Sequence, residues 1–149
     1  MIKRLSVALL AMILSATVQA ADGKIDVKSN HSVAATADKL EALLQAKGMT
    51  VFTRIDHRAG AESVGLSLRD TQLVIFGNPN VGTPLMNCAQ SVAIDLPQKA
   101  LIWEDEKGQV WLSYNDPAYL ASRHSIQGCD VVLKKVSGVL ANFAKAVTE

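Results

Sequence analysis

Sequence patterns that identify common enzymes and nucleic-acid-binding proteins are missing from this chain of 149 residues. It contains no Gly-x-Gly-x-x-Gly motif, no complete phosphate-binding loop, no Cys-x-x-Cys pair and no His-x-x-x-His spacing. Aromatic residues make up 5% of the chain, and 15 basic residues nearly balance 14 acidic ones. A nucleic-acid groove needs clustered Lys and Arg beside stacking aromatics, so we expect no nucleic-acid partner.

Long apolar runs are scarce, and the most pronounced one lies at the N-terminus. Lys3 and Arg4 precede an apolar stretch over residues 5–13, and Val18-Gln19-Ala20 carries small residues at the two positions that a signal peptidase reads. The stretch is shorter than the roughly 20 residues that cross a bilayer as a helix, and no Cys follows it for lipid attachment. We therefore expect residues 1–20 to be a secretory signal peptide.

Cleavage after Ala20 would leave a single domain over residues 21–149, periplasmic or secreted and with no membrane attachment. The expected signal peptide contains two basic residues and no acidic ones, so the mature chain has 13 basic against 14 acidic residues. This near-neutral balance again argues against a polyanion-binding surface. A chain of this length can bury the core of one domain of ordinary size.

Cysteine is also scarce, with only Cys88 and Cys129. An exported chain meets an oxidising environment, where an even number of cysteines favours a disulfide. Closing a loop of about 40 residues would stabilise the fold by ~3–4 kcal/mol in the chain-entropy model. Free buried thiols are one alternative, and a redox-active or metal-binding pair is a weaker one because no Cys-x-x-Cys spacing lowers a thiol pKa.

Hydrophobic periodicity predicts strands mixed with helices. We predict strands over residues 24–30, 49–57, 63–68, 71–76, 99–104 and 109–114. We predict helices over 33–47, over 84–90, from Pro117 in the segment that Gly128 ends, and after Asp130, with Arg58–Glu62 as a loop. The order lacks a strict strand–helix alternation, so we expect an α+β fold in which an antiparallel sheet carries the two long helices on one face.

The stretch GNPNVGTPLM at residues 77–86 can be interpreted in two ways. Thr83 and Pro84 suit the N-cap and first position of a helix, and Gly82 gives the backbone freedom to turn. The free N–H groups of a helix N-terminus attract anions, which would make this a ligand-binding loop. The same residues suit a plain strand-to-helix turn, so both interpretations stay open.

Several segments, each short, together resemble the domain of unknown function 302 family. They are RIDH at Arg54–His57, LR-x-T-x-L-x-IFGNP at Leu68–Pro79, GTPLM at Gly82–Met86, AIDLP-x-K at Ala93–Lys99, WED at Trp103–Asp105, the strand Trp111–Tyr114 and PAYLASRH at Pro117–His124. The resemblance covers about residues 24–147 and implies a small TBP-like α+β fold and a homodimer, but no established reaction. Asp70 departs from the Pro that the family pattern has there.

Two histidines could carry chemistry, namely His57 at the end of a predicted strand and His124 at the end of a predicted helix. Because imidazole titrates near neutral pH, either could serve as acid or base in an enzyme of hydrolase or isomerase type. A metal-binding protein is a further alternative, in which both histidines would converge with one of Asp56, Asp95 or Asp116. Structural hydrogen bonding is the plainer role, and we predict neither a cofactor nor a metal site.

The favoured interpretation is an exported module that binds a small ligand, or a dimeric structural or stress-related component. Polar residues of the family motifs fall near strand ends and loops, where binding sites usually lie. Trp103 and Trp111 are expected to pack on the sheet or form a dimer face. We expect a small anionic ligand in a cleft that His57 and His124 border, and the candidate ligand-binding residues are Asn78, Gly82, Thr83, Lys99 and Tyr114.

Overall fold

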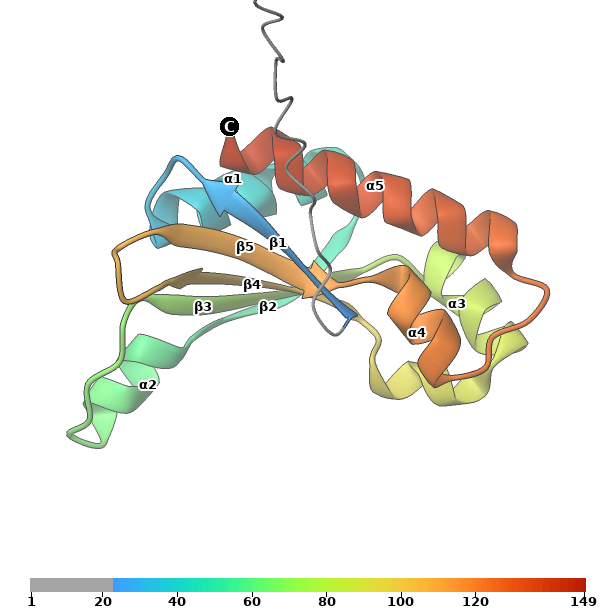
Figure 1. Cartoon of the computed structure of the whole chain (residues 1–149), viewed down its shortest axis with the longest axis horizontal. Helices are drawn as coiled ribbons and strands as arrows, with labels where there is room; N and C mark the ends of the chain where they lie inside the picture. The colour runs from blue at the N-terminus through green and yellow to red at the C-terminus, as the bar shows by residue number, and fades with distance from the viewer. Residues whose placement is uncertain (1–22) are drawn as a thin grey trace, which may run out of the picture.

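Five antiparallel strands form one sheet in the computed structural model, which describes residues 23–149 (Figure 1). The spatial order of the strands is β1-β5-β4-β3-β2, so β1 and β2 form the edges. The predicted signal peptide lies outside the described residues. The strands are β1 Lys24–Ser29, β2 Thr50–Asp56, β3 Thr71–Gly77, β4 Gln98–Glu104 and β5 Val110–Asn115.

The two long helices lie on one face of this sheet, and the short helices gather at its ends (Figure 1). Helices α3 and α4 lie beyond one end, under the first half of α5, whereas α2 projects from the other end. This arrangement confirms the predicted α+β fold. The helices are α1 Val33–Ala46, α2 His57–Ser63, α3 Pro79–Cys88, the 3-10 helix η2 Gln90–Ile94, α4 Pro117–Arg123 and α5 Asp130–Thr148.

The core lies between the sheet and the two long helices. Alternate residues of each strand point to this side, because successive side chains of a strand face opposite ways. Each large apolar side chain buried there stabilises the fold by roughly 1.5–3 kcal/mol relative to exposure. The buried residues include Val74, Phe76, Ala100, Ile102 and Leu112 from the strands and Leu40, Leu44, Val136, Leu140 and Phe143 from the helices.

Helix α1 begins and ends close to the predicted positions. The Ser32 hydroxyl accepts the N–H of Ala35 at 3.2 Å and caps the helix, and Gly48 follows the last turn with φ +69°. The buried hydroxyls of Ser29 and Thr36 lie 2.7 Å apart and join β1 to α1. This pair satisfies two polar groups that would otherwise weaken the core.

The strands predicted over residues 99–104 and 109–114 pair as the β4–β5 hairpin. The Asp105 carboxylate accepts the N–H groups of Lys107 and Gln109, each at 2.9 Å, and Gly108 has φ +76°. The other carboxylate oxygen of Asp105 accepts the indole N–H of Trp111 at 2.9 Å. This indole hydrogen bond, followed by the backbone ones, lowers the pKa of Asp105 below its ordinary value.

Two predictions for the segment between β2 and β3 are wrong. The expected loop at Arg58–Glu62 belongs to α2, because the Asp56 carboxylate accepts the N–H of Ala59 at 2.9 Å and caps that helix. Residues 63–68 form the end of α2, a turn and irregular chain rather than a strand. Their alternating apolar pattern pairs with no strand of the sheet within residues 23–149.

The helix predicted over residues 84–90 begins earlier, at Pro79. Asn78 Oδ1 accepts the N–H of Asn80 at 2.9 Å, and Pro79 takes the first helical position, so this pair starts the helix. Pro84 is accommodated inside α3 although it cannot donate a backbone hydrogen bond. The family motif that contains these residues is therefore mostly helical.

Cys88 and Cys129 form a disulfide, which confirms the predicted pairing. Their Cα atoms lie 6.4 Å apart, and 41 positions separate them in the sequence. The bond joins the last residue of α3 to the N-cap position of α5. Asp130, the predicted cap of this helix, is instead its first residue.

Loss of this disulfide should lower the free energy of unfolding by roughly 2–5 kcal/mol, because the unfolded chain gains the freedom that the closed loop removes. Urea unfolding with and without reductant measures the change. The double variant Cys88→Ser/Cys129→Ser should be insensitive to reductant and serves as the control. Alkylation of the native protein without reductant should add no mass, and two alkylated cysteines would contradict the pairing.

Candidate functional site

A cavity of about 500 Å³ lies between α3, η2, α5 and the adjoining ends of β2, β3 and β4. Its walls are almost entirely apolar, and it is partly open to solvent. The largest lining side chains are Met49, Phe52, Phe76, Leu85, Met86, Leu96, Leu140 and Phe143. The size falls within the range of small-molecule sites, which hold roughly 300–1,000 Å³.

Gly82 lines the cavity in the wall formed by α3. A Cβ atom on Gly82 would lie 3.8 Å from Leu96 Cδ1 and 4.0 Å from Met86 Cε, which is ordinary van der Waals contact. The helix thus places a residue without a side chain against the cavity, between the lining residues Val81 and Leu85. The stretch GNPNVGTPLM therefore both turns the chain and lines the cavity.

Polar groups are few at the cavity. Thr50, Asn78, Gln98 and Lys135 contribute to the lining, and Lys135 is the charged residue among the lining positions. The Asn78 side chain already accepts a hydrogen bond at the start of α3. The chemistry that the cavity offers is accordingly apolar contact, with one cation on α5.

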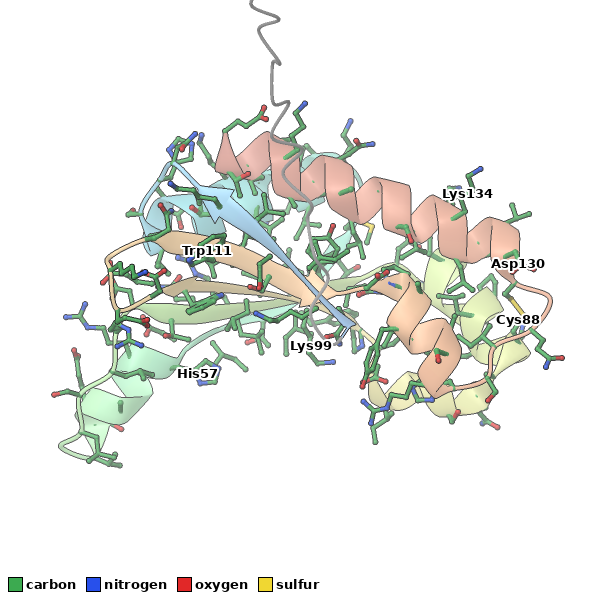
Figure 2. The ribbon with its side chains drawn as sticks, in the orientation of Figure 1. His57, Cys88, Lys99, Trp111, Asp130 and Lys134 are labelled. Atoms are coloured by element: carbon green, nitrogen blue, oxygen red, sulfur yellow. A yellow bond between two sulfur atoms is a disulfide. The ribbon has the colours of Figure 1, made fainter. Side chains whose placement is uncertain are left out.

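The structure separates the candidate ligand-binding residues. Asn78 and Gly82 line the cavity, whereas Thr83, Lys99 and Tyr114 do not. Lys99 lies on the sheet face that α1 and α5 leave uncovered (Figure 2), where its ammonium donates to the carbonyl oxygens of Asp95 at 3.0 Å and Pro97 at 3.1 Å.

Tyr114 points the other way, into the layer of the long helices. Its neighbour across the sheet is Ala100, a buried core residue, and Tyr114 itself is 6% exposed. Burial, followed by the nearby charge of Asp116, raises the pKa of the Tyr114 hydroxyl. Lys99 and Tyr114 therefore lie on opposite faces of the sheet and do not border one cleft.

The two candidate histidines lie at opposite ends of the sheet. His57 is the exposed first residue of α2 (Figure 2), next to the end of β2. His124 is the C-cap of α4, beside η2 and the segment that leads into β4. A shared acid–base or metal site of the expected kind is not assembled, and residues 23–149 contain no group of three potential metal-ligating side chains.

His124 does form a hydrogen-bonded chain that links α4 to η2. Its Nε2 lies 2.5 Å from Asp95 Oδ2, and its Nδ1 lies 3.0 Å from Ser91 Oγ. Arg123 adds a contact of 3.3 Å to the other carboxylate oxygen of Asp95. Ser91 was not foreseen, because only the fold brings residues 91 and 124 together.

In this chain of contacts the imidazole lies between a hydroxyl and a carboxylate, as it does in the catalytic triad of Ser-His-Asp hydrolases. Here the residues Ser91, His124 and Asp95 do not line the cavity, and the His124 side chain is only 6% exposed. We therefore assign this chain of contacts a structural role, which is to hold η2 against α4. Since η2 and the residues after it supply Ala93, Leu96 and Pro97 to the cavity, the contacts also support its wall.

Arg54 also lies outside the cavity, and it does not pair with Asp56 on its own strand. Its guanidinium donates to Asp38 at 2.6 Å, to Glu41 at 3.2 Å and to Gln72 at 2.6 Å. These contacts tie β2 and β3 to α1, so the ion pairs of Arg54 stabilise the fold.

Comparison with protein families gives one match, a model described as domain of unknown function DUF302, over residues 25–143. A solved structure of an uncharacterized conserved DUF302 protein from Bacillus stearothermophilus superimposes with a TM-score of 0.76 and 17% sequence identity. The match covers 87% of this chain and 100% of that one. At this identity the likeness establishes a common fold.

Curated relatives come from Brucella. The chain is 48% identical over 126 residues to the fluoride-specific ion channel FluC 1 of Brucella suis biovar 1 (strain 1330) and to FluC 2 of Brucella melitensis biotype 1 (strain ATCC 23456 / CCUG 17765 / NCTC 10094 / 16M). These matches cover 82% of this chain and 50% and 47% of the relatives, so the chain spans about half their length. None of the helices in residues 23–149 is long and apolar enough to cross a membrane.

Replacement of His124 by Ala should lower the free energy of unfolding by about 1–3 kcal/mol, because it leaves the half-buried Asp95 carboxylate without its imidazole partner. Ser91→Ala, which removes one hydrogen bond at the exposed end of the chain, should cost about 0.5–1 kcal/mol. Urea unfolding measures both. His31→Ala is the matched control, because the partly exposed His31 ring contacts the exposed Lys39 and no buried carboxylate. An equal midpoint for His31→Ala and His124→Ala would contradict the structural role.

Proposed function

The chain belongs to the DUF302 family over residues 25–143, and from that premise we propose that it is an exported module that binds a small apolar molecule. The observation that carries the proposal is the cavity of about 500 Å³ with almost entirely apolar walls. The family itself is described as having no known function, so the activity is argued from this geometry.

Protein interiors are close-packed, and voids larger than a water molecule are few. A water molecule occupies about 30 Å³ in the liquid, so the cavity has room for roughly 17 groups of that size. Because the cavity is partly open to solvent, it is a site that a ligand can enter rather than an enclosed packing void. An apolar ligand would remove both its own surface and the cavity walls from water, at about 25 cal/mol for each Å² buried.

The wall residues favour a ligand with an apolar body over the small polar anion expected from the sequence. Lys99 and the histidines lie elsewhere, and the loop contributes Pro79, Val81 and Gly82 to the cavity. The side chains of Met49 and Met86 are unbranched and polarizable, which lets a wall adapt to ligands of irregular shape.

Export is part of the proposal because of the signal-peptide pattern at residues 1–20. The Cys88–Cys129 disulfide supports it, since disulfides form and persist in oxidising compartments such as the periplasm. Fluoride transport, which is the named activity of the longer Brucella relatives, is not part of the proposal, because the chain matches about half of those proteins.

Filling the cavity from α3 should weaken ligand binding. The neutral fluorescent probe N-phenyl-1-naphthylamine should bind the wild-type protein saturably, and Gly82→Leu should weaken its affinity at least tenfold because the new side chain occupies the cavity. Gly82→Ala should bind nearly as the wild type does, because its Cβ meets no atom closer than 3.8 Å. Both variants replace a helical Gly and should gain up to ~1 kcal/mol of helix propensity.

Fluorescence titration measures these affinities, and thermal unfolding confirms that both variants fold. A wild-type protein that shows no saturable signal would refute ligand binding by this cavity. Equal affinities of Gly82→Leu and Gly82→Ala would place the probe elsewhere on the protein.

We further propose that two copies of the chain associate through the α2 segment, residues 57–68. No residue of α2 is buried, and Val64 and Leu66 in the following turn are 70% and 65% exposed. Figure 1 shows α2 projecting from the end of the sheet, on the side away from α1 and α5. Exposed apolar patches of this kind mark interaction sites.

The same chain offers a complementary surface. The sheet face that α1 and α5 leave uncovered carries Leu73, Ile75 and Leu101, and it also carries the cross-strand pair Trp103 and Trp111. A symmetric dimer would bury the α2 segment of each copy against this face of the other.

The exposed apolar side chains at this end supply part of the area that a dimer needs. The four of them each bury on the order of 60–120 Å², so they supply roughly 240–480 Å² of the ~800 Å² per partner of a standard interface, and the sheet face supplies the rest. Arg58 is already paired with Glu62 at 2.9 Å and with Asp70 at 2.6 Å, so these charges do not oppose association. The four residues are Ile55, Val64, Leu66 and Leu68.

A charge in the α2 segment should break the dimer. The wild-type protein should sediment at twice the monomer mass at micromolar concentration, whereas Leu66→Glu should sediment as a monomer, because the interface would then bury an unpaired carboxylate. Val131→Glu, at a position on α5 that is 82% exposed, is the matched control and should remain dimeric. A monomeric wild-type protein at 100 µM, or a dimeric Leu66→Glu variant, would contradict this interface.

A further inference from the structure

We infer that the occupant of the cavity is a single-chain anionic amphiphile, with its hydrocarbon chain between α3 and α5 and its head group beside Lys135. This inference rests on the proposed function, because it names the class of molecule that the same cavity binds. It depends on three features of the described residues, namely the charge at the rim, the shape of the lining and the scarcity of polar groups.

The charge at the rim of the cavity is positive and comes from Lys135. Lys135 lies on α5 one position before Val136, and Val139, Leu140 and Phe143 continue the same wall. Within residues 23–149 it takes part in none of the ion pairs, and no Asp or Glu lines the cavity. A lysine in this position can lay its methylene stem along the apolar wall and hold its ammonium at the opening.

The lining suits a flexible chain better than a rigid polar ring. Polar side chains that would fix the orientation of a heterocycle are limited to Thr50, Asn78 and Gln98, and Asn78 is already engaged at the start of α3. The remaining walls are aliphatic, thioether and phenyl groups. With about 30 Å³ for each methylene-sized group, the cavity accommodates a chain of roughly 12–14 carbons and leaves room at the opening.

An anionic head would complement Lys135, the charged residue that lines the cavity among residues 23–149. An ammonium near a carboxylate or phosphate at a partly exposed site favours binding modestly, and salt screens the attraction. The hydrocarbon chain therefore supplies most of the affinity, and Lys135 supplies the preference among head groups. A neutral or cationic head on the same chain should bind less tightly.

The experiment displaces N-phenyl-1-naphthylamine with dodecanoate, dodecyl phosphate, dodecanol and dodecyltrimethylammonium, each below its critical micelle concentration. The wild-type protein should bind the two anions about five- to tenfold more tightly than dodecanol, and the cation most weakly. The preference should shrink as the salt concentration rises. The two anions distinguish a carboxylate from a phosphate head, and a preference for either one supports the inference.

Lys135→Gln should remove the preference for anions and leave the affinity for dodecanol unchanged, and Lys135→Glu should reverse the preference toward the cation. Lys134→Gln is the matched control, because Lys134 is an exposed neighbour that does not line the cavity and points away from the sheet (Figure 2). An equal effect of Lys134→Gln and Lys135→Gln would overturn the role of Lys135.

Failure of the inference is distinguishable from failure of the proposed function. If all four amphiphiles bind equally and Gly82→Leu blocks them, the cavity binds apolar molecules but the anionic class is wrong. If none of them displaces the probe while the probe itself is blocked by Gly82→Leu, the single-chain class is wrong. If the probe does not bind at all, the proposed function and this inference both fail.

Discussion

The placement of α5 across one face of the sheet is the constraint on which the other features depend. The second half of this helix packs with α1 over the core, whereas its first half extends over α3 (Figure 1). The Cys88–Cys129 disulfide ties the start of α5 to the end of α3. Because the cavity lies between these two helices, the covalent bond and the core packing together fix the distance between its walls.

Hydrogen bonding supports the opposite wall of the cavity. His124 links Asp95 and Ser91, so it holds η2 and the residues that lead into β4 against α4. The contacts of Ser91, His124 and Asp95 resemble a hydrolytic triad, but we assign them the role of supporting the cavity wall. The other end of the molecule is stabilised differently. Helix α2 is held by its cap and its ion pairs, and none of its residues is buried. One end is organised around a cavity, and the other presents an uncovered apolar surface.

The sequence predicted most elements because their signals are local. The helix over residues 33–47, the helix that begins at Pro117 and the strands β3 to β5 were all predicted close to their observed bounds. Errors occurred where local signals compete. Asn78-Pro79 and Thr83-Pro84 both suit a helix start, and the fold uses the first pair. Residues 63–68 alternate as a strand does, but no strand pairs with them in the described part of the chain. Of the candidate ligand-binding residues, only Asn78 and Gly82 line the cavity.

By itself the sequence determined the family, the α+β class and the importance of the stretch from Gly77 to Met86, because cap chemistry, periodicity and short motifs act over a few residues. Only the tertiary structure decided which side chains share a site. Lys99 and Tyr114 are separated by the two faces of a sheet, and the cavity joins α3 to a stretch of α5 more than 40 positions away. Such neighbours arise from packing between distant segments, and no local pattern encodes them.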